Sequence, residues 1–116
     1  MSDNRLVEFD NRRGANVMTT AVAKSFRLLE ALTIAHHRGP SDTWTAARDR
    51  AAEAAGIERS YAARIWNRWQ SMKDVSGEAL MRLSDAYTAQ CEHNEKMAAL
   101  HRQRREELAH GGEADA

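Results

Sequence analysis

The residues best suited to bind a ligand lie close together in the middle of the chain. Asn67 and Arg68 lie one helical turn after Arg64, and Ser60 lies one turn before it. An arginine guanidinium pairs bidentately with phosphate or a guanine edge, an asparagine amide matches an adenine edge, and serine binds phosphate oxygens. These residue types at this spacing predict hydrogen bonds to phosphates and base edges.

Charge in the same stretch favours a negatively charged partner. Residues 57–73 carry Arg59, Arg64, Arg68 and Lys73 against Glu58 alone, a local balance of +3. The whole chain has a net charge of zero, which argues against a general nucleic-acid coat protein. The alternative interpretation is that these charges only cover a solvated helix face.

The opposite side of residues 57–73 is apolar at helical pitch. It carries Ala62, Ile65, Trp66, Trp69 and Met72. We assign Trp66 and Trp69 to the core, because they share the side of Ile65 and large aromatic side chains anchor small cores. The segment is therefore predicted to be one helix with a buried face and a polar face.

A second predicted helix precedes this one, over residues 43–55. Ser41, Asp42 and Thr43 supply capping oxygens at its start, and Trp44 is expected to pack against the preceding helix. Its buried side is mostly alanine, which allows close helix approach. Gly56 should end it with a positive φ angle.

The run RAAEAAGIERSYAARI resembles the helix-turn-helix signature of bacterial and phage DNA-binding proteins, over about residues 48–69. The match rests on a small residue where the helices cross, a turn glycine, an aliphatic residue after it and two buried positions: Ala52, Gly56, Ile57, Ala62 and Ile65. The family usually has larger aliphatic residues where this chain has Ala55 and Ala62.

The resemblance implies that the helix beginning near Arg59 lies in the major groove of duplex DNA. Arg64 is then expected to bind guanine and Asn67 adenine, while Tyr61 stacks or binds a phosphate. The complete set of expected DNA-binding residues is Arg59, Ser60, Tyr61, Arg64, Asn67, Arg68 and Lys73.

Composition and periodicity predict an all-α fold, a small helical bundle with a long C-terminal helix, and the resemblance implies that the bundle contains a helix-turn-helix. We expect a flexible or extended arm at residues 1–16, a single helical domain at 17–109 and a disordered tail at 110–116. A first helix is expected over 17–37. The long helix, capped by Ser76, should bury Leu80, Leu83, Ala86 and Tyr87.

The second half of the long helix has a sparse apolar pattern, at Met97, Leu100 and Leu108. If the helix runs to Leu108, it needs a packing partner, and the resemblance implies a second copy of the chain, because helix-turn-helix proteins commonly dimerise. The alternative is that its last turns fray.

Enzymatic chemistry is not expected. The sequence has no phosphate loop, nucleophile elbow or HExxH motif, and Cys91 and His93 point to diverging sides of a helix, away from a shared metal. We expect no cofactor, no metal and no small-molecule substrate. A single cysteine, with no signal peptide or membrane-length apolar run, favours the cytoplasm.

These features together predict a sequence-specific, dimeric transcriptional regulator of duplex DNA, a repressor of bacterial or phage type. Two alternatives stay open. One is a helical protein–protein interaction module, such as an adaptor or inhibitor, and the other is a low-specificity DNA-packaging or architectural protein.

Overall fold

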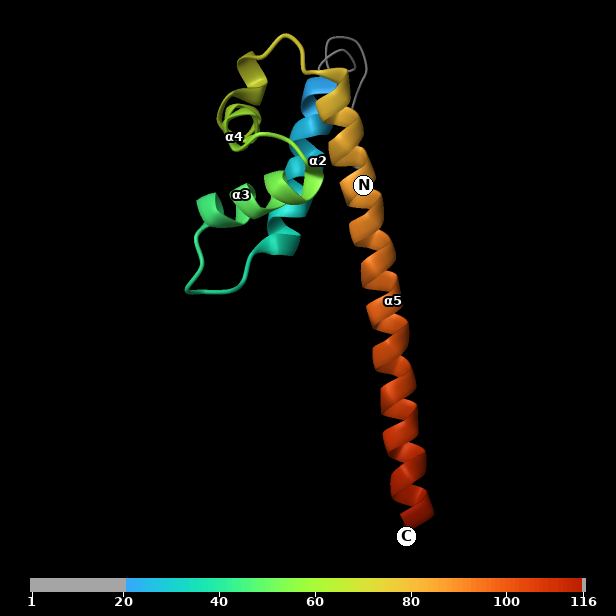
Figure 1. Cartoon of the computed structure of the whole chain (residues 1–116). Coiled ribbons are helices and arrows are strands. Elements are labelled where there is room, and N and C mark those ends of the chain that lie inside the picture. The colour runs from blue at the N-terminus through green and yellow to red at the C-terminus, as the bar shows by residue number, and fades with distance from the viewer. Residues whose placement is uncertain (1–20, 116) are drawn as a thin grey trace, which may run out of the picture.

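The computed structural model describes residues 21–115, and in that range the chain forms helices and turns without strands (Figure 1). The elements are α2 (Ala21–His36), α3 (Trp44–Ala55), α4 (Arg59–Arg68), the short 3-10 helix η1 (Trp69–Ser71) and α5 (Gly77–Asp115). The all-α class and the long C-terminal helix are confirmed. The predicted arm at 1–16 and the predicted helix start at residue 17 lie outside the described residues.

Helix α2 is the central element of the folded part, because it packs against α3, α4 and α5. Its apolar stripe places Leu29 and Leu32 fully inside the core, where α3 contributes Ala51 and Ala52. Alanine on the facing helix lets the two backbones approach closely, as the sequence predicts. The face of α2 that carries Leu29 and Leu32 is therefore buried between its neighbours.

The loop between α2 and α3 is held by the carboxylate of Asp42. It accepts hydrogen bonds from the backbone N–H of Arg38 (3.0 Å) and of Thr43 (2.9 Å), and it forms an ion pair with Arg50. Arg50 also donates to the carbonyl of His36 at 2.9 Å, which ties α3 to the last residue of α2. The N–H of Arg38, followed by the Arg50 side chain, lowers the pKa of the Asp42 carboxyl below its ordinary value.

The turn between α3 and α4 depends on Gly56, whose φ is +79°. The N–H of Gly56 donates to the carbonyl of Glu53 (3.1 Å), and the N–H of Ile57 donates to that of Ala52 (3.0 Å). This pair of bonds is the Schellman arrangement, in which a left-handed residue satisfies the last carbonyls of a helix. The predicted glycine stop is therefore confirmed, and it sets the direction in which α4 leaves.

Helix α4 ends earlier than the sequence predicts. Beyond Arg68 the chain tightens into η1, and Met72 is extended, with φ −79° and ψ 136°. The Ser71 hydroxyl donates to the carbonyl of Arg68 at 3.1 Å, a local bond of the kind that competes with helical ones. Lys73 consequently lies beyond the helix and not on its polar face.

Helix α5 begins where the Ser76 hydroxyl accepts a hydrogen bond from the N–H of Ala79, at 3.2 Å. Leu83 is fully buried, but Leu80 is only half-buried and Tyr87 is exposed, so the predicted stripe is narrower than expected. The helix continues to Asp115, beyond the expected end at residue 109. Adding a residue to the end of a formed helix costs less free energy than starting a new helix. Residues of low helix propensity can therefore continue α5 beyond residue 109.

The second half of α5 extends away from the other helices (Figure 1). Leu100 and Leu108 are 45% and 71% exposed. A 39-residue helix that packs only through its first turns gives the molecule a long dimension of 65 Å. The projecting half has no packing partner among residues 21–115.

Candidate nucleic-acid interface

One side of α4 is buried against the rest of the fold. Ala62 and Ile65 have no exposed surface, and Trp66 and Trp69 are partly buried against the core. Both indole rings contact Phe26 of α2, with ring centroids at 6.0 Å for Trp66 and 4.9 Å for Trp69, which stacks. The tryptophans are thus packing residues, as the sequence predicts, and both of them pack against Phe26 of α2.

The other side of α4 carries the predicted polar face. Ser60, Arg64, Asn67 and Arg68 are all exposed, on successive turns of one helix. Lys73 is exposed as well, in the segment after η1. Within the described part of the chain, neither Arg68 nor Lys73 forms an ion pair. Their charges are therefore free to attract an anion.

Arg59 differs from the other basic residues of this face. Its guanidinium forms an ion pair with Glu53 near the end of α3. The hydrogen bond to that carboxylate raises the pKa of Arg59 above its ordinary value, and the charge of Asp49 adds to the effect. A phosphate would have to compete with Glu53 for this side chain, so Arg59 contributes less to an anion site than its sequence position indicates.

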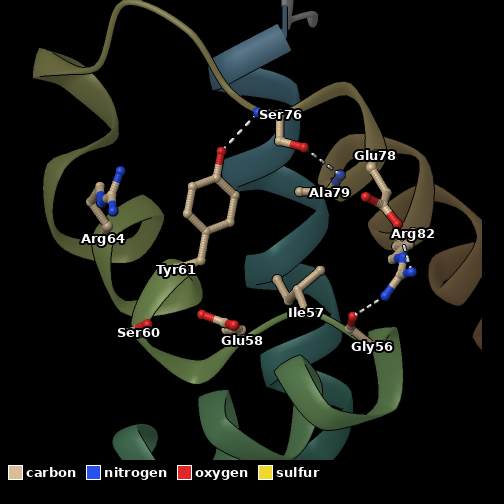
Figure 2. A pocket seen from close by; sticks show the side chains of 10 residues that line it. All are labelled: Gly56, Ile57, Glu58, Ser60, Tyr61, Arg64, Ser76, Glu78, Ala79 and Arg82. Carbon is tan, nitrogen blue, oxygen red and sulfur yellow. Dashed lines mark hydrogen bonds and ion pairs between the residues drawn. The ribbon is translucent and has the colours of Figure 1, made fainter.

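Tyr61 is half-buried and turned toward the start of α5 (Figure 2). Its hydroxyl accepts a hydrogen bond of 2.7 Å from the backbone N–H of Ser76. The guanidinium carbon of Arg64 lies 5.3 Å from the centroid of its ring. The structure thus gives Tyr61 contacts within the protein, where the sequence predicts a group that binds nucleic acid.

An open pocket of about 340 Å³ separates the first turn of α4 from the first turns of α5. Figure 2 shows Arg64 and Tyr61 on one side of it and Glu78 and Arg82 on the other. Arg82 donates to the carbonyl of Gly56 at 2.5 Å and pairs with Glu78 at 2.6 Å. Sequence reasoning missed this residue. The i, i+4 spacing of Glu78 and Arg82 predicts their pairing, but not the bond to the turn.

The described residues contain no group of three or more His, Cys, Asp or Glu side chains arranged to hold a metal ion. None of the helices in the described range combines the length and the hydropathy needed to cross a membrane.

Comparison with known proteins finds no matching family model, and neither a curated protein nor a solved structure matches the chain. A function for the polar face of α4 is therefore argued from the side chains of this protein and not from relatives.

Proposed function

We propose that the protein binds duplex DNA through the polar face of α4 and acts as a sequence-specific transcriptional regulator. The observation that carries the proposal is the division of α4 into two faces. Its apolar side is buried, while Arg64, Asn67 and Arg68 are exposed together on the other side. A helix fixed in this way can enter the major groove with its polar side chains toward the bases.

The exposed side chains have distinct proposed roles. Arg64 suits the paired acceptors of guanine, and Asn67 suits the donor and acceptor of adenine. Arg68 and Lys73, which form no ion pair among residues 21–111, suit backbone phosphates. Ser60 lies on the same exposed face, near the start of α4, and suits a phosphate oxygen. Arg59 joins them only by leaving Glu53, because that ion pair occupies its guanidinium.

We further propose that the projecting half of α5 pairs with a second copy of the chain. Met97, Leu100 and Leu108 fall within one side of that helix, and covering Leu100 and Leu108 would remove exposed apolar surface from water. A dimer would place two α4 helices in successive major grooves, about 34 Å apart, on a palindromic site. A dimer bound in this way represses transcription by blocking access of the transcription machinery to the DNA. The proposed location is the cytoplasm, in association with the nucleoid.

Selection of bound sequences from a random duplex pool tests the proposal most directly. The expected result is a palindromic motif, bound with an affinity that falls steeply as salt rises. If the protein binds duplexes from the pool without a shared sequence motif, and with the same salt dependence, the result would indicate the low-specificity architectural alternative. No binding at low salt would refute DNA binding.

A pair of double variants then tests the assignment of the face. Arg64→Ala with Asn67→Ala should abolish base preference, while helicity and oligomeric state stay unchanged. Arg102→Ala with Gln103→Ala is the control, because it removes a guanidinium and a carboxamide from exposed positions of α5 that lie off the side of Met97, Leu100 and Leu108. Equal losses from both variants would show that α4 is not the interface.

The second candidate function is a protein-interaction module, and exposed apolar residues at the α2–α3 end favour it. Ile34 is 59% exposed, and Trp44 is 52% exposed, contrary to the expectation that it packs on α2. Its indole instead contacts the ring of His37, with centroids 4.0 Å apart. This function predicts binding to a protein partner that is nearly indifferent to salt and is weakened by Trp44→Ala.

A further inference from the structure

Tyr61 lies between the first half of α4 and the start of α5. Its hydroxyl accepts the N–H of Ser76, the residue that caps α5, and its ring packs against the core beside Ile65. The tyrosine is therefore held at both ends. A ring fixed in this way is a rigid surface on the N-terminal half of α4, three residues before Arg64.

Arg64 would otherwise be a mobile side chain. It is exposed, and no carboxylate in the described part of the chain forms an ion pair with it. Its guanidinium carbon lies 5.3 Å from the centroid of the Tyr61 ring, within the range in which a cation is attracted to an aromatic face. The i, i+3 spacing on one helix brings the two side chains together. The ring thus restrains the residue to which we assign guanine recognition.

We propose that Tyr61 is a positioning residue, which holds the Arg64 guanidinium in place before DNA binds and makes no contact with DNA itself. The inference depends on the proposed function for its role, but the contact between the two side chains can be tested without DNA. Its physical basis is the conformational entropy of arginine, since a side chain ordered in advance loses less freedom on binding.

The contact is tested first in the free protein by NMR. The Arg64 Hδ protons should show cross-peaks to the Tyr61 ring and ring-current shifts, which Arg68 lacks. Tyr61→Leu should abolish those shifts and Tyr61→Phe should keep them, because the phenylalanine ring retains the packing against the core that holds it beside Arg64. The absence of these cross-peaks in the wild-type protein would overturn the proposal. Because this measurement uses the wild-type protein, it does not depend on whether a variant folds.

The role is tested by a double-mutant cycle in duplex affinity, using the sequence enriched from the random pool. Tyr61→Leu should weaken binding about 2- to 5-fold, the range expected for an exposed cation–π contact. It should have no effect when Arg64→Ala is also present, and Tyr61→Phe should remain close to wild type. Circular dichroism and the urea midpoint identify any loss that comes from unfolding.

The outcomes separate failure of the inference from failure of the proposed function. If Tyr61→Leu weakens binding equally with and without Arg64, then Tyr61 contacts the DNA directly and the positioning role is wrong. If the wild-type protein binds no duplex, or Arg64→Ala binds as well as the wild type, then the proposed function fails. The NMR result then still decides whether the ring holds the guanidinium.

Discussion

Substituting Gly56 should destabilise the fold by an amount that depends on the shape of the new side chain. Gly56 has φ +79°, a left-handed conformation that costs an L-residue with a Cβ about 1–2 kcal/mol. An added Cβ would lie 3.3 Å from Nη1 of Arg82, the end of a flexible side chain, so a small shift relieves that contact. We therefore expect about 1–2 kcal/mol for Gly56→Ala, less for Gly56→Asn and more for β-branched Gly56→Val.

Urea denaturation monitored by circular dichroism measures this series. With a slope of roughly 2 kcal/mol per molar urea, Gly56→Ala should lower the midpoint by about 0.5–1 M. Gly77→Ala is the control, because Gly77 lies in α5 with open space around its added Cβ, and alanine favours a helix. The reasoning is refuted if Gly56→Ala is as stable as the wild type, or if valine costs no more than asparagine.

Three further predictions concern the core and the α2–α3 loop. Ile65→Ala should cost about 2–5 kcal/mol, since Ile65 is fully buried, whereas Asn67→Ala on the exposed face should change stability by under about 0.5 kcal/mol. Thermal melts compare the two. Thr33→Val should leave stability unchanged or raise it, because the buried Thr33 hydroxyl has no hydrogen-bond partner; a loss above about 1 kcal/mol would contradict this. Asp42 has a folded-state pKa below its unfolded value, so its stabilisation is present above about pH 4 and is lost as pH falls through the folded value. Asp42→Asn should lower stability at pH 7 and flatten the acid limb of the stability curve, as urea midpoints between pH 2 and 7 would show.

The elements that the sequence predicts well are those decided by local chemistry. Thr43 caps α3 through its hydroxyl, which accepts the N–H of Ala46 at 3.0 Å, and Gly56 ends that helix in the left-handed conformation. Both depend on interactions within a few residues of the chain. The two faces of α4 were predictable for the same reason, since helical pitch alone separates Ile65 from Asn67.

The predictions that differ from the structure involve competition between interactions. Helix α4 stops at Arg68 while its apolar pattern continues, and the Trp69 ring stacks on Phe26 from within η1. Helix α5 continues to Asp115 through a glycine pair that alone would favour disorder. Sequence periodicity shows that two interactions favour different structures at these positions, but it does not show which of them contributes more free energy.

The sequence by itself determined the helical class, the caps and which residues of α4 share a face, because these depend on spacing and short-range bonds. Only the tertiary structure decided what each polar side chain meets. Arg59 pairs with Glu53, Arg82 binds the carbonyl of Gly56, and Tyr61 accepts the N–H of Ser76. The last two contacts join residues 26 and 15 positions apart, and they exist because burial of apolar surface packs α5 against α2 and α3, which brings its first turns near Gly56 and Tyr61. That packing leaves Arg64, Asn67 and Arg68 as the exposed group on which the proposed function depends.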